Sequence, residues 1–199
     1  MNLAAIRAEV QARGYDYLST ARVNTFINMA QNEVCSYMPW PFLETSVGPS
    51  ASPLTISNLG WVLSVVDSES DQSLSRADRR FILNEDADLS ETGSPQVYWL
   101  EGNTVVVWPG SGTDTITVRY VQTPTDMSSD SDTSVIPTGF HDLLVLGAVA
   151  HAQMDNDDWQ GYQFTRQVWQ NRIDGMVQAV MGRDLGGPTL MTVTEPKDW

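Results

Sequence analysis

The side chains best suited to chemistry are two histidines that each have an aspartate nearby. His141 directly precedes Asp142, and His151 lies four residues before Asp155, a spacing that brings two side chains to one face of a helix. Such pairs could bind a metal ion or relay a proton. Zinc needs three or four ligands, however, and His141 and His151 are ten residues apart and point in different directions. The sequence therefore predicts no enzyme, no metal site and no cofactor.

The remaining reactive groups have ordinary structural explanations. Cys35 is the only cysteine, so no internal disulfide can form, and we expect it to be a small buried residue on a helix. Carboxylates gather in residues 85–91 and 126–132. Neither cluster has the glycine and terminal glutamate spacing of a calcium-binding loop, so both are expected to be solvated loops.

The charge of the 199-residue chain is strongly negative, with a net value of −14, and the acid is concentrated in the middle. Residues 39–136 contain fourteen acids and four arginines, whereas residues 1–38 are neutral. Lys197 is the only lysine, and no basic stripe exists that could neutralise phosphates, which argues against gripping nucleic acid. The longest apolar run, 143–150, is far shorter than the roughly 18 residues of a membrane span, so no membrane partner is expected.

Helical periodicity occupies both ends of the chain. It predicts helices over 3–12 and from about residue 20 to Pro39, and again over 140–154 and from 155–158 to about 181. Two of these helices carry amides at spacings of three and four where charges are usual. We interpret these faces as contacts with another copy, the alternative being a solvated surface. The amides are Asn24, Asn28, Asn32, Gln160, Gln163, Gln167 and Gln170.

The middle of the chain has the signals of β structure. Short strands are predicted at 54–56 and 61–66, a hairpin at 97–108, and an alternating strand at 115–121. A capping box at Ser75 predicts a short helix that ends near Asn84. The fold class is therefore α+β. We expect residues 1–38 and 137–181 to form a helical bundle, 39–136 a β-rich insertion with an antiparallel sheet or sandwich, and 182–199 an extended arm.

The order of several motifs resembles the head-to-tail adaptor, or connector, proteins of tailed bacteriophages. The likeness covers most of residues 20 to 181 and depends on aromatic residues, prolines and small residues in a fixed order. Its motifs are Gly93-Ser94-Pro95-Gln96-Val97-Tyr98, Val107-Trp108-Pro109, Ile116-Thr117-Val118-Arg119-Tyr120, Pro124, Ile136-Pro137, Phe140-His141-Asp142-Leu143-Leu144 and Gly147-Ala148-Val149-Ala150.

This resemblance implies a structural component of the virion neck, assembled in the host cytoplasm. Such adaptors form a ring, typically of twelve copies, which docks on the portal protein and contacts a downstream neck or tail protein. DNA passes through the acidic channel only as cargo. In such adaptors a C-terminal arm commonly docks on the portal, and here the arm would be anchored by Leu190, Val193 and Trp199.

A second hypothesis is a β module that binds a ligand or carbohydrate and is supported by helices. In that case Trp61, Trp99 and Trp108 would be platforms on which sugar rings stack. The alternation of apolar and polar residues places some of these side chains in the core, which favours the adaptor.

Overall fold

The computed structural model describes residues 1–110 and 114–184, and it confirms the α+β fold class. The chain divides into two compact units. Within the described residues, a helical unit consists of Met1–Val34 and Met127–Asp184, and a β unit lies within Cys35–Asp126. The predicted arm residues, Leu190, Val193 and Trp199, lie outside the described residues.

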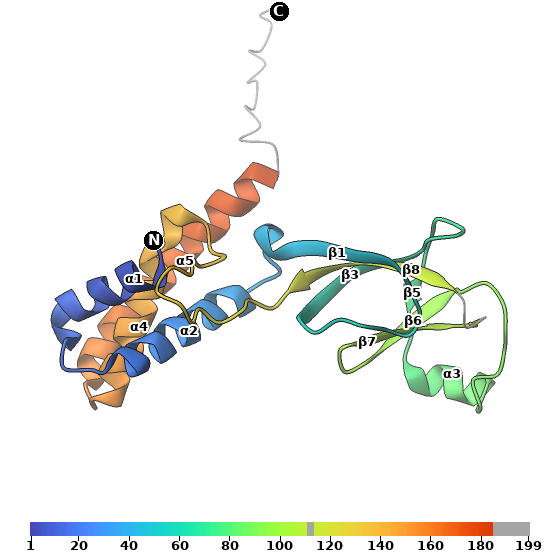
Figure 1. The fold of residues 1–199 in the computed structure, drawn as a ribbon, viewed down its shortest axis with the longest axis horizontal. Helices are drawn as coiled ribbons and strands as arrows, with labels where there is room; N and C mark the ends of the chain where they lie inside the picture. The colour runs from blue at the N-terminus through green and yellow to red at the C-terminus, as the bar shows by residue number, and fades with distance from the viewer. Residues whose placement is uncertain (111–113, 185–199) are drawn as a thin grey trace, which may run out of the picture. The chain divides into compact units, whose positions relative to one another are not determined.

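Four helices lie side by side in the helical unit (Figure 1). The side chain of Asn2 caps the first helix by accepting a hydrogen bond from the Ala5 amide nitrogen at 3.0 Å. A turn follows in which Gly14 has φ +97°, a conformation that glycine adopts without strain. The helices are α1 (Leu3–Val10), α2 (Thr20–Ser36), α4 (Asp142–Asp155) and α5 (Trp159–Asp184), with a π-helical turn at Gln11–Tyr15 and a 3-10 turn at Thr138–Phe140.

Helix α4 is the most deeply buried helix of this unit, as its nearly continuous apolar sequence predicts. Its residues Leu143, Leu144 and Ala148 have no exposed surface. Gly147 lets α2 approach closely, because a Cβ atom at this position would lie 2.6 Å from the methyl group of Ala30. The small residues of α4 therefore set the distance between the helices.

The β unit contains two four-stranded sheets. Their strand orders are β1-β8-β3-β4 and β2-β7-β6-β5, and every pair is antiparallel except β5 with β6. A short helix, α3 (Arg79–Glu85), follows β5. The strands are β1 (Glu44–Ala51), β2 (Leu54–Thr55), β3 (Leu59–Asp67), β4 (Gln72–Ser73), β5 (Ser75–Arg76), β6 (Val97–Glu101), β7 (Thr104–Trp108) and β8 (Thr115–Gln122), and a 3-10 turn at Pro41–Leu43 precedes β1.

The core of the β unit follows the alternation seen in the sequence. Ile116, Val118 and Tyr120 of β8 are buried on one face, as predicted for a half-buried strand. Leu74 and Val105 join the same cluster. The apolar side chains of the two sheets thus share one core.

The start of α3 differs from the prediction. Ser75 does not cap this helix, because Ser75 and Arg76 form β5 and pair in parallel with Val97 and Tyr98. Asp78 is the cap instead, and its side chain accepts a hydrogen bond from the Arg80 amide nitrogen at 2.8 Å. Aspartate caps helices as well as serine does, and Ser75 cannot be the cap because it lies in a strand.

Candidate oligomer interface on the helical unit

His141 and Asp142 do not bind each other, and each makes contacts that stabilise the fold. His141 is buried, its Nε2 donates a hydrogen bond to the Ile136 carbonyl at 2.8 Å, and its Nδ1 lies 2.5 Å from the terminal nitrogen of Met1. Burial lowers the pKa of His141, and the hydrogen bond to Ile136 opposes that shift. Asp142 instead binds Arg172, with 2.6 Å between Oδ2 and Nε. These contacts hold the start of α4 against the N-terminus and against α5.

The second pair is also separated. His151 is buried, its ring is stacked against Phe26 at 6.1 Å, and its Nε2 lies 3.1 Å from Glu33 Oε1. The two atoms are close but do not have hydrogen-bond geometry. Asp155 pairs with Arg22. Within residues 1–110 and 114–184, no three His, Cys, Asp or Glu side chains are grouped to hold a metal ion.

Glu33 joins three helices of the unit. It contacts His151 of α4, and its Oε2 accepts a hydrogen bond from Arg166 Nη1 of α5 at 2.5 Å. Burial alone would raise the pKa of Glu33, but the contacts with His151 and Arg166 outweigh burial and hold the pKa below its ordinary value. The carboxylate is therefore ionised at neutral pH and fixes α5 relative to α2.

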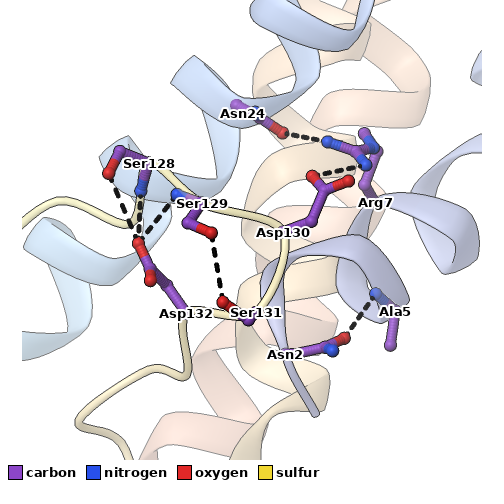
Figure 2. A network of polar contacts seen from close by, with 9 residues as sticks. All are labelled: Asn2, Ala5, Arg7, Asn24, Ser128, Ser129, Asp130, Ser131 and Asp132. Carbon is purple, nitrogen blue, oxygen red and sulfur yellow. Dashed lines mark hydrogen bonds and ion pairs between the residues drawn. The ribbon is translucent and has the colours of Figure 1, made fainter.

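Asn24 and Asn28 of α2 form hydrogen bonds within the chain. Figure 2 shows Arg7 of α1 donating to Asn24 Oδ1 at 3.3 Å and to Asp130 Oδ1 at 2.8 Å. Asn28 forms two hydrogen bonds of 3.0 Å with the backbone of Met127, one to each polar group. Asn32 is exposed. The asparagine stripe thus secures the loop that follows the β unit.

The same loop is held in shape by Asp132. Its carboxylate accepts hydrogen bonds from the amide nitrogens of Ser129 and Ser128, each at 2.8 Å (Figure 2). These bonds lower the pKa of Asp132 and keep it ionised. Asp126 and Asp130 are exposed, as expected for a solvated loop, and backbone hydrogen bonds from Leu3 and Ala4 hold this loop beside α1.

The amides of α5 lie on the side of the helix away from the core. Trp169 is buried and its Nε1 donates to the Leu143 carbonyl at 3.2 Å, which fixes the rotation of α5 against α4. Gln170 is half-buried, and its Nε2 donates to Asp174 Oδ1 at 3.3 Å. The exposed residues between 160 and 171 form what we call the α5 face: Gln160, Gln163, Phe164, Gln167, Val168 and Asn171.

The α5 face carries no charge. The two charged residues between 159 and 173 are Arg166 and Arg172, which bind Glu33 and Asp142 of the same chain. Phe164 is 71% exposed at the centre of the face. Sequence analysis missed Phe164, although it lies four residues after Gln160 and so belongs to the same stripe. A solvated helix face normally carries charge, so this face has the character of an interface.

A depression opens between α2 and α4 on the same unit. Its volume is about 320 Å³, and its walls are mainly the side chains of Phe26, Met29 and Met154 with the ring of His151. Arg22 and Asp155 line it as well, and they form an ion pair. We call this depression the α2–α4 pocket.

The β unit gives little support to a ligand-binding module. Trp99 is 3% exposed, and its Nε1 donates to Glu101 Oε1 at 3.0 Å. Trp108 is half-buried and donates to Asp86 Oδ2. Of these three tryptophans, Trp61 is the one with a largely accessible ring, at 46% exposed. The tryptophans therefore do not form the set of stacking platforms that the second hypothesis needs.

Comparison with known proteins identifies the family. None of the curated proteins compared with the chain matches it. A family model described as SU10 adaptor protein matches residues 1–192. No helix in the described part of the chain is long and apolar enough to cross a membrane. The family match extends over almost the whole chain and confirms the resemblance to phage head-to-tail adaptors. The chain therefore belongs to the SU10 adaptor protein family and is a structural adaptor of a phage virion.

Proposed function

We propose that copies of this chain assemble side by side into a ring that docks on the portal and continues the DNA channel toward the tail. The observation that carries this proposal is the α5 face, where six exposed residues include no charge and one of them is Phe164. Exposed apolar and amide side chains without charge are typical of surfaces that become buried in an assembly. Asn32 and Met29, exposed on α2, are candidates for the opposing surface.

The acid in the middle of the chain suits a channel through which DNA moves. Residues 39–136 carry a large excess of carboxylates, and carboxylates repel phosphates instead of neutralising them. A channel wall of this kind does not hold the genome in place. DNA is then a passing cargo, and the β unit is the part that meets the downstream neck or tail protein.

The ring is tested by placing charge on the α5 face. Replacing Gln163 and Gln167 together with glutamate changes almost no volume but adds two negative charges to the α5 face of each copy. We expect the double variant to fold normally and to form no rings on the portal, because burying the unpaired charges costs about 3 kcal/mol per contact. Electron microscopy of portal particles mixed with the variant measures this directly.

The matched control is Gln72→Glu/Gln96→Glu, which adds the same two charges at exposed positions of the β unit. It should leave the ring intact. Rings that form equally well with Gln163→Glu/Gln167→Glu would show that the α5 face is a wet exterior, and the proposal of a ring built on this face would fail.

The arm is proposed to anchor the ring on the portal through Leu190, Val193 and Trp199. Ending the chain after Leu185 removes all three residues and leaves α5 complete. We expect the shortened chain to have the melting temperature of the full chain and to lose binding to portal particles in co-sedimentation. Undiminished co-sedimentation would assign portal binding to another part of the adaptor.

A further inference from the structure

Phe164 is the most exposed of the large apolar side chains in residues 1–110 and 114–184. Its neighbours one turn before and after it on α5 are Gln160, Gln167 and Val168, all exposed. A phenyl ring held in water by a rigid helix is unfavourable in a monomer, and such residues are often the anchors of an interface. An apolar site that receives this ring would remove it from water.

The α2–α4 pocket has the size and chemistry to accept a phenyl ring. An apolar cavity of roughly 150 Å³ binds benzene, and this depression has a volume of about 320 Å³. Met29 and Met154 at its mouth are 41% and 40% exposed, and methionine side chains adapt readily to an entering aromatic group. The ring of Phe26, stacked on His151, provides an aromatic wall.

The pocket is electrostatically compatible with the uncharged surroundings of Phe164. Arg22 and Asp155 bind each other, so the pocket holds no uncompensated charge that would exclude an apolar group. Around the phenyl ring, Gln160 and Gln167 carry amides that can both donate and accept hydrogen bonds. Such amides can donate to a carboxylate like that of Asp155 and accept from a guanidinium like that of Arg22. A charged partner surface would fit the α5 face less well.

Phe164 cannot enter the pocket of its own chain. Arg166 of α5 points toward α2, since it binds Glu33. Successive helical residues are separated by about 100°, so Phe164 lies about 200° around α5 from Arg166 and points away from α2. The pocket is lined by residues of α2 and α4 alone. An aromatic ring from the α5 face must therefore come from a second copy.

We propose that Phe164 of one copy inserts into the α2–α4 pocket of the next copy. The inserted ring and the receiving pocket are at different places on the surface, so the contact is head-to-tail and repeats from copy to copy until a ring closes. This inference rests on the proposed ring and adds to it the pair of sites that sets its direction.

The test places the photoreactive amino acid p-benzoylphenylalanine at position 164 of the full chain and illuminates adaptor rings assembled on portal particles. The substitution keeps an aromatic side chain at this position. We expect a ladder of covalent oligomers, and mass spectrometry should find the attachment at Met29 or Met154 of a second copy. The same amino acid at Phe81, an exposed position of α3, should not produce this attachment.

The possible results separate the two proposals. Rings without an attachment to the pocket, or with attachment to position 164 of another copy or to the portal, would overturn the insertion of Phe164 and leave the ring standing. Absence of rings with the unmodified chain would instead overturn the proposed function.

As a second measurement, Phe164→Ala should raise the adaptor concentration needed for ring formation about tenfold or more, whereas Phe81→Ala should not change it.

Discussion

Alanine in place of Gly48 should lower the free energy of unfolding of the β unit by about 3 kcal/mol. Gly48 lies in β1 and has φ +122°, a backbone conformation that residues with a side chain rarely adopt. A Cβ atom here would be 2.4 Å from the Ile116 carbonyl oxygen and 2.8 Å from Thr117 Cα. Both are backbone atoms of the paired strand β8, so no side-chain rotation can relieve the clash. The pairing of β1 with β8 must open instead.

Gly102 is the matched control for Gly48. It also has positive φ, at +59°, but an added Cβ would meet nothing within 4 Å. Gly102→Ala should therefore cost only the backbone strain, about 1–2 kcal/mol. Urea unfolding gives the two free energies, and hydrogen exchange of β8 amides reports whether β8 loses protection in Gly48→Ala. Equal losses for the two variants would mean that the close approach to Ile116 is absorbed without cost.

Strands with strong local signals could be predicted, whereas those made by pairing could not. Gly102-Asn103 between two β-prone runs predicts the hairpin of β6 and β7, and the structure confirms it. Strand β1 was not predicted, because Gly48 and Pro49 interrupt its sequence. It forms because β8 supplies its hydrogen bonds, and the paired residues, such as Val47 and Val118, are far apart in the sequence. Local propensity contains no information about such a partner.

The candidate interface could be predicted only in part for a similar reason. The spacing of Gln160, Gln163 and Gln167 places them on one side of a helix, and the structure confirms that all three are exposed. Asn28 shows the same spacing on α2, yet its partner is the backbone of Met127, 99 residues away. The spacing of amides in a sequence is the same whether a loop of the same chain or another copy covers them.

The α2–α4 pocket lay beyond sequence analysis for a further reason. Phe26 and His151 belong to helices from opposite ends of the chain, and both lie on faces that an apolar pattern assigns to the core. Whether two helices leave space between them depends on the size of the residues at their crossing. Here those residues are Ala30 and Gly147.

Alanine in place of Gly147 should therefore destabilise the helical unit by about 2 kcal/mol and impair assembly. The added Cβ would lie 2.6 Å from the Ala30 methyl group, about 1 Å closer than two carbon atoms tolerate, and 3.3 Å from Trp169 Nε1. Neither the methyl group nor the buried indole can rotate away, so α2 and α4 must separate. Because these two helices form the pocket proposed to receive Phe164, the same substitution should weaken ring formation on the portal.

Gly175→Ala makes the same change at an open site, since an added Cβ at Gly175 meets nothing within 4 Å. In the middle of α5 it should stabilise the chain by about 0.5–1 kcal/mol, because alanine has the higher helix propensity. Urea unfolding of the two variants should therefore give changes of opposite sign. If Gly147→Ala were stabilising as well, α2 and α4 would have room to spare at their crossing. The geometry of the pocket would then not depend on the absence of a side chain at Gly147.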